Sequence, residues 1–281
     1  MAFTASTVLP EINAKDASGV TSEIYRSIEA ALGVRLVNLV YRHLATVPGA
    51  LEWAWAVVGD GFKTEIYKER SAPLADFGKR LAGATGDLRL ISLKGYGLTP
   101  REAAAVRVTL NAYNRANPMN ALSLRVIALA LSAGWRPPAV RTNIFTSVPP
   151  VDLLPMGRLQ DLDGDTSSYL SRLALYTTGV ESDLVPSLFR HFVPWPSFLA
   201  GLGDWLQPLH EDDLISHFSS EISREADAAA KEIFDNLNVV ENTLAAPNED
   251  TRLALSRTIA QFLPAICRMI VIGGLLSSSI R

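Results

Sequence analysis

Cysteine is nearly absent from this chain of 281 residues, since Cys267 is the only one. A single thiol excludes an internal disulfide framework, a paired-cysteine redox motif and a zinc site built from several thiolates. The sequence also lacks the H-E-x-x-H zinc motif, a phosphate-binding loop, a dinucleotide fingerprint and the G-x-S-x-G nucleophile motif. Nothing in it predicts a metal site or a bound organic cofactor.

An excess of positive charge is missing as well, because 26 basic residues face 29 acidic ones and the net charge is -3. Without a basic stripe to neutralise phosphates, a nucleic-acid partner is not expected. The first ten residues have neither the basic nor the apolar part of a secretory signal. The apolar run from Phe262 to Leu276 contains Arg268 and is too short to favour a membrane span. We expect a soluble, cytoplasmic protein with no membrane partner.

Runs of alternating β-branched residues are absent, and helical periodicity dominates instead. Ile24, Ile28 and Leu32 form an apolar stripe at helical spacing, and Gly33 is a typical helix stop. The sequence therefore predicts an all-α fold. The expected helices cover residues 21–32, 100–114, 118–133, 166–177, 184–192, 212–238 and 250–275.

The chain also repeats itself. Residues 36–44 (LVNLVYRHL) are echoed by residues 184–192 (LVPSLFRHF), and Gly33 is matched by Gly179. A proline-rich stretch without helical period separates the two copies. We predict a first helical repeat at 1–134, a linker at 135–158 and a second helical repeat at 159–281. Two similar halves form a pseudo-dimer, and the cleft between them is the natural ligand site.

The repeat helps to separate structural residues from functional ones. The Arg-His pair at residues 42–43 recurs at residues 190–191, which favours a structural role over catalysis in both copies. Asp183 instead stands where the first half has Arg35. Its functional interpretation is a general base facing the cleft. The competing interpretation, favoured by the sequence alone, is that Ser182 or Asp183 caps the next helix.

Two further polar features break the pattern. Four asparagines lie between residues 111 and 120, where the second half is largely apolar. Amides such as that of Asn114 suit the positioning of a water or a carboxylate, and helix capping around Pro118 is the competing interpretation. Asp60 is a lone acid in an apolar stretch, best interpreted as part of the polar face of a helix.

Several short segments stand in a distinctive order along the repeat: residues 44–49 (LATVPG), 54–55 (AW), 113–114 (YN) with 117–118 (NP), 182–183 (SD) and 195–196 (WP). In these segments and in its duplicated helical plan, the chain resembles the group I 2-haloacid dehalogenases, which act on D- or DL-substrates. The resemblance implies a duplicated all-α enzyme that hydrolyses the carbon–halogen bond of small 2-haloacids without a cofactor, and that forms a homodimer. It also implies that water attacks the substrate directly and inverts it, with no covalent intermediate.

Roles carry over from the resemblance to individual residues. Asp183 falls on the aspartate that activates water, Ser197 on a second water-holding residue, and Ser182 and Asn114 on residues that line the pocket. Leu36 and Leu39 stand where the family places aromatic walls, and Ile259 stands near an expected tyrosine. These departures would enlarge the pocket and change the range of substrates, whereas the small Ser197 favours D-2-haloacids.

Two other functions stay open. One is a hydrolase for another small activated carboxylic acid, and the other is a non-catalytic ligand-binding or scaffold protein.

Overall fold

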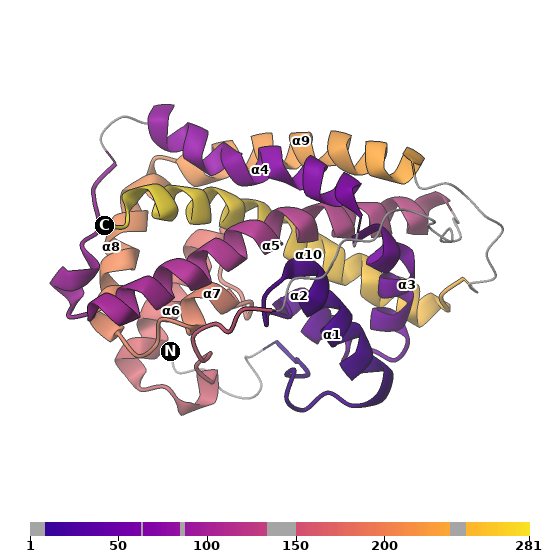
Figure 1. Cartoon of the computed structure of the whole chain (residues 1–281), viewed down its shortest axis with the longest axis horizontal. Helices are drawn as coiled ribbons and strands as arrows, with labels where there is room; N and C mark the ends of the chain where they lie inside the picture. The colour runs from indigo at the N-terminus through magenta and orange to yellow at the C-terminus, as the bar shows by residue number, and fades with distance from the viewer. Residues whose placement is uncertain (1–8, 63, 85–87, 134–149, 237–245) are drawn as a thin grey trace.

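A computed structural model describes residues 9–62, 64–84, 88–133, 150–236 and 246–281. Within these ranges the chain forms helices and no strand, apart from the isolated bridges Val34–Val151 and Ile91–Ile280 (Figure 1). The expected all-α fold is confirmed.

Each half of the described chain contains five α-helices, and corresponding helices have similar lengths. In the first half these are α1 (Gly19–Leu32), α2 (Leu39–Leu44), α3 (Ala50–Phe62), α4 (Glu65–Ala84) and α5 (Pro100–Ala133). In the second half they are α6 (Gly164–Thr178), α7 (Ser187–Arg190), α8 (Pro196–Glu211), α9 (Leu214–Asn236) and α10 (Glu249–Ser279). The 3-10 helices η1 (Leu93–Tyr96) and η2 (Leu159–Asp161) precede α5 and α6. Much of the expected linker, residues 134–149, lies outside the described residues, so its boundaries stay a prediction.

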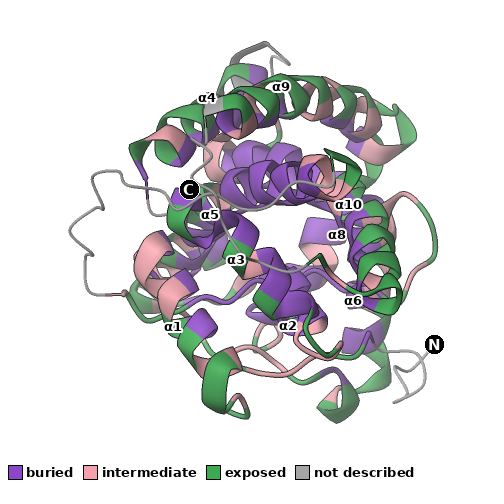
Figure 2. Cartoon of the chain, turned by 90° about the vertical axis from the view of Figure 1, so that its right-hand side faces the viewer, coloured by how far each residue is buried: buried purple, intermediate pink, exposed green. Residues whose placement is uncertain are grey.

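The two longest helices form the centre of the molecule. α5 and α10 pack against each other, and each also packs on the outer helix of the other half, α5 on α9 and α10 on α4. Figures 1 and 2 show α4 and α9 as an outer layer above this pair, with the shorter helices on the other side. Because each half covers the central helix of the other, their common interface is a large part of the hydrophobic core.

Helix α10 is long and apolar enough to cross a membrane by length and composition. In this fold 67% of its most apolar window is buried against other helices. A central helix of a large helical core shows the same combination, since it is apolar on all sides.

Glycine ends the first helix of each half as expected. Gly33 and Gly179 have φ angles of 64° and 79°, a left-handed conformation that is costly for residues with a Cβ. Each amide closes its helix by donating to a backbone carbonyl, of Glu29 and Leu175 respectively.

Two details differ from the sequence-based expectation. A helix break at Pro118 was expected, yet α5 runs through this buried proline without interruption, since packing in the core offsets the lost backbone bond. The expected helix at 184–192 is shorter, because Pro186 is the N-cap and α7 starts at Ser187. The capping interpretation of Ser182 and Asp183 is therefore wrong. Ser182 Oγ accepts a bond from the Leu184 amide in a local turn at 3.1 Å.

Candidate active site

A cavity of about 50 Å³ lies where the two halves meet. A water molecule needs at least about 10–15 Å³ on this measure, so the cavity has room for a solute of a few non-hydrogen atoms. The first half contributes the start of α2 and the middle of α5, and the second half contributes α6, α7, α10 and the segment before α7. The lining residues are Asn38, Leu39, Val40, Tyr113, Asn117, Thr177, Leu184, Pro186, Ser187, Leu188, Phe262, Ala265, Ile266 and Met269.

The cavity wall is mostly apolar, and its polar groups are amides and hydroxyls. Asn38 is buried at the N-cap of α2, yet its side chain makes no capping bond. Its Oδ1 atom has no hydrogen-bond partner among the described residues. A capping asparagine usually contributes about 1 kcal/mol to helix stability. A side chain that forgoes this bond and lines a cavity is a candidate for binding a solute or a water.

Behind the cavity, the carboxylate of Glu11 bridges one arginine from each half. It accepts bonds from Arg42 Nε at 2.7 Å and from Arg190 Nη1 at 2.8 Å. All three side chains are at least nine-tenths buried. Burial alone would raise the pKa of Glu11, but the two guanidiniums reverse this and hold it below the usual value. We refer to Glu11, Arg42 and Arg190 as the Glu11 clasp.

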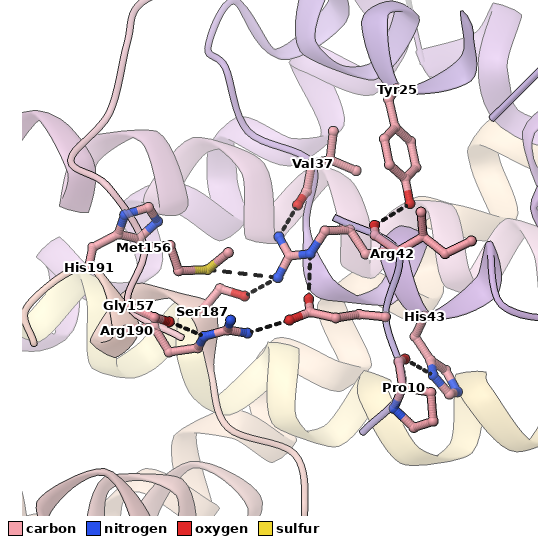
Figure 3. A network of polar contacts seen from close by, with 12 residues as sticks. Pro10, Tyr25, Val37, Arg42, His43, Met156, Gly157, Ser187, Arg190 and His191 are labelled. Carbon is pink, nitrogen blue, oxygen red and sulfur yellow. Dashed lines mark hydrogen bonds and ion pairs between the residues drawn. The ribbon is translucent and has the colours of Figure 1, made fainter. Parts of the chain in front are cut away.

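The Glu11 clasp is hydrogen-bonded to one residue of the cavity wall, Ser187. Arg42 Nη2 donates to Ser187 Oγ at 2.9 Å, so the first half binds the second at the cavity wall (Figure 3). Arg42 also donates to the Val37 carbonyl, and Arg190 Nε donates to the Gly157 carbonyl at 3.1 Å. Backbone carbonyls and one neighbouring acid therefore hold both guanidiniums, as the structural interpretation of the paired arginines predicts.

The histidines of the two repeats are also bound to backbone carbonyls. His43 Nδ1 contacts the Pro10 carbonyl at 2.8 Å, and His191 Nδ1 donates to that of Leu154. His191 Nε2 then accepts from the hydroxyl of Tyr113, 3.1 Å away on the cavity wall. Burial, together with the nearby guanidiniums, lowers the pKa of His191 to about 4. At neutral pH this ring is uncharged and serves to hold Tyr113.

Comparison with known proteins identifies the fold. No protein-family model matches the chain, and no curated protein matches it in sequence. A solved complex of a D-2-haloacid dehalogenase mutant with D-2-CPA matches with a TM-score of 0.79 and 18% identity, covering 97% of this chain and 96% of that one. A complex of D-2-haloacid dehalogenase with L-LA matches with a TM-score of 0.78 and 17% identity, covering 99% and 98%. The chain has the fold of the D-2-haloacid dehalogenases.

In this D-2-haloacid dehalogenase fold, Asp183 is exposed to solvent and is not among the residues that line the cavity. The residue that follows it, Leu184, lines the cavity. Asp183 Oδ1 accepts from Gln261 Nε2 at 3.4 Å, and the next residue along α10, Phe262, lines the cavity as well. Asp183 and its partner Gln261 thus each adjoin a wall residue along the chain.

The other residues suggested by the resemblance are dispersed. Leu39 lines the cavity, whereas Leu36 is buried beside a separate outer cleft that also contains Arg42 and His191. Ile259 is buried on α10 one turn before Phe262. Ser197 is exposed in the first turn of α8. Of the predicted site residues, only Leu39 is among the described residues that line the cavity, and Asn114 and Ser197 lie elsewhere.

Asn114 makes its contacts on a different face of α5. Its Nδ2 donates to the Gly273 carbonyl at 3.0 Å and to Ser277 Oγ at 2.7 Å, which ties α5 to α10. A Cβ added at Gly273 would lie only 2.0 Å from Asn114 Oδ1. The glycine therefore permits a close approach of the two central helices, and the Asn114 amide occupies the space.

This contact leads to a prediction about stability. Gly273→Ala is expected to lower the free energy of unfolding by about 1–3 kcal/mol, because the added methyl overpacks the contact. In an Asn114→Ala background the same change should be neutral or stabilising by up to about 1 kcal/mol, the usual gain of alanine over glycine in a helix. Urea denaturation of the four proteins measures this cycle. If Gly273→Ala changed the free energy of unfolding equally in the wild-type and Asn114→Ala backgrounds, the side chain of Asn114 would not be what limits the space at Gly273.

Sequence reasoning missed several residues that form the site: Glu11, Asn38, Tyr113 as a lining residue and Ser187. Two of them carried a usable signal, because Asn38 corresponds to Pro186 and Leu39 to Ser187 in the aligned repeats. The same comparison between halves that selected Asp183 would have selected these positions. Glu11 carried no such signal, since it lies outside the repeated segments.

Proposed function

We propose that this protein hydrolyses short 2-haloalkanoic acids to 2-hydroxy acids, with a preference for D-substrates. Asp183 takes a proton from a water molecule, whose oxygen forms a bond to C2 while the carbon–halogen bond breaks and halide leaves. Attack from the side opposite the halogen inverts the carbon, and no ester with the protein forms. Asp183 then releases the proton to solvent, so the reaction needs no redox partner.

The observation that carries this proposal is the small cavity between the repeats, two wall residues of which directly follow Asp183 and its partner Gln261 in the chain, in a protein with the D-2-haloacid dehalogenase fold. Displacement at a saturated carbon requires an aligned water and a base that is not itself the nucleophile. Leu39, Leu184 and Met269 offer an apolar wall for the alkyl group and halogen. The unpartnered Oδ1 of Asn38 can accept a hydrogen from the attacking water. No group of three or more potential metal-ligating side chains occurs in the ranges that the structure covers.

The test is halide release from D- and L-2-chloropropionate and 2-bromopropionate, measured without added metal. Asp183→Asn should lower the rate by at least about 100-fold, the usual contribution of a general base. Glu181→Gln removes an exposed negative charge two residues away and is the matched control, which should keep the wild-type rate. Chiral analysis of the lactate formed reports inversion and the preferred enantiomer.

Direct attack by water is tested separately. In a single turnover in H₂¹⁸O with enzyme in excess, the label should appear in the hydroxy acid from the first turnover. Label on the protein with unlabelled product would indicate an ester intermediate and contradict the mechanism. Folded wild-type protein that releases no halide from any of the four substrates would refute the dehalogenase assignment.

One observation favours a second function. Asp183 is exposed and bound by Gln261, and neither Ser197 nor Asn114 lies with it at the cavity. This arrangement suits a ligand-binding protein that retained the duplicated fold without the chemistry. Binding of 2-chloropropionate without halide release would support it.

A further inference from the structure

The charges behind the cavity do not balance. Arg42 and Arg190 are both buried, and they share the one carboxylate of Glu11. The other carboxylates near Arg42, at the outer cleft, are Glu29 and Asp152. Asp152 forms an exposed pair with Arg35 at 2.6 Å, and burial raises the pKa of Glu29, which the nearby Arg35 only partly offsets. The three side chains of the Glu11 clasp themselves therefore carry a net charge of one positive unit.

Among the described residues, Ser187 both lines the cavity and is hydrogen-bonded to Arg42. Its side chain is buried and accepts the bond from Arg42. A guanidinium has only donors, so the serine hydroxyl must direct its own hydrogen to another acceptor. That acceptor is the oxygen of Tyr113 or a ligand in the cavity. Burial raises the pKa of Tyr113 to about 12, and the hydrogen bond with Ser187 offsets only a small part of this rise. An anion is the stronger acceptor, because hydrogen bonds to charged groups are roughly twice as strong.

We propose that Ser187, polarised by Arg42, is the anion-binding corner of the cavity and that it selects ligands with a carboxylate. On the proposed function, from which this inference takes its substrate, the carboxylate of the 2-haloacid is bound at Ser187 and the rest of the molecule contacts the apolar wall. Arg42 and Glu11 act through Ser187 and are positioning residues. The first half lacks this corner because Leu39 occupies the equivalent position, so the carboxylate has one orientation in the cavity.

Binding of propionate and of its neutral isostere propionamide tests the selection without any reaction. Isothermal titration calorimetry of the whole chain should show tighter binding of propionate. Ser187→Ala should raise the Kd of propionate about tenfold or more, the worth of a hydrogen bond to a charged group, and leave that of propionamide within about threefold. Ser187→Thr keeps the hydroxyl and should restore the preference for propionate.

Thr177→Val is the matched control, because Thr177 also lines the cavity but its hydroxyl is bound to the Leu173 carbonyl of its own helix. This variant should change both Kd values by the same factor. The inference is overturned if the wild type binds propionamide as tightly as propionate, if it binds neither, or if Ser187→Ala keeps the wild-type ratio.

The outcome also separates this inference from the proposed function. If the protein binds propionate selectively through Ser187 but releases no halide, the proposed dehalogenase activity is refuted and the anion site is supported. Halide release with a KM that Ser187→Ala leaves unchanged keeps the dehalogenase and refutes the anion site. If both hold, Ser187→Ala should raise KM more than it lowers kcat, the signature of a group that binds ground state and transition state alike.

Discussion

Replacing Glu11 by glutamine is expected to lower the free energy of unfolding by about 3–5 kcal/mol, the usual result of removing one partner from a buried ion pair. The neutral amide leaves Arg42 and Arg190 buried side by side without a counter-charge. Urea denaturation should show a lower midpoint with an unchanged slope, because the amount of surface exposed on unfolding stays the same.

Glu23→Gln is the matched control for this variant, since it removes the same charge from an exposed position in α1. It should change stability by less than about 0.5 kcal/mol. Adding Arg190→Met to Glu11→Gln should cost less than the two single effects combined, since it removes one of the unpaired cations. A Glu11→Gln protein within about 1 kcal/mol of wild type would show that the clasp does not stabilise the fold.

Acidification from pH 7.5 to pH 5 is expected to cost about 2 kcal/mol of stability through His191 alone. Its folded-state pKa of about 4 lies below the unfolded value of 6.5, so the unfolded state binds more protons in this range. The contribution of the neutral ring is fully present above the unfolded pKa and is lost as pH falls toward the folded pKa. Chemical denaturation at half-unit pH intervals measures the slope.

The His191→Gln variant isolates this effect. Glutamine removes the titrating group while keeping an acceptor for the Tyr113 hydroxyl, so stability should depend less steeply on pH between 7 and 5. Glu11 titrates below this window, because its folded pKa is held under the usual 4.5. If the wild-type slope persisted in His191→Gln, another group would cause the acid sensitivity.

Much of the fold could be predicted from local patterns. The stripe of Ile24 and Ile28 and the stop at Gly33 define α1 to within two residues, because they depend only on neighbours along the chain. The course of α5 through Pro118 could not be predicted, since the burial that offsets the proline comes from helices distant in sequence. The short α7 depends likewise on Pro186, which lies inside a segment that the repeat suggested was helical.

The candidate site was less predictable than the fold. Asp183 was selected because it breaks the repeat; it is exposed and bonded to Gln261, and its catalytic role stays a prediction. The amide of Asn114 looked equally suited to a pocket, but its position along α5 directs it to Gly273 instead of the face that carries Tyr113 and Asn117. Facing directions around a long buried helix depend on tertiary packing, which residue type alone does not reveal.

The Glu11 clasp has a consequence for how a duplicated chain can acquire a new specificity. In a symmetric dimer of identical subunits, each of the two equivalent arginines would have its own glutamate partner. Every substitution would then be present in both copies. Here the segment before α1 supplies the carboxylate, whereas the segment before α6 offers Arg190 and His191 the carbonyls of Gly157 and Leu154 and offers Arg42 the sulfur of Met156. Because the halves belong to one chain, Glu11 can bind two arginines, and the equivalent positions 39 and 187 can carry different residues, leucine and serine. The two sides of the cavity are therefore chemically different, with a hydroxyl at Ser187 and an apolar side chain at Leu39, so the proposed site can distinguish the two ends of a small ligand.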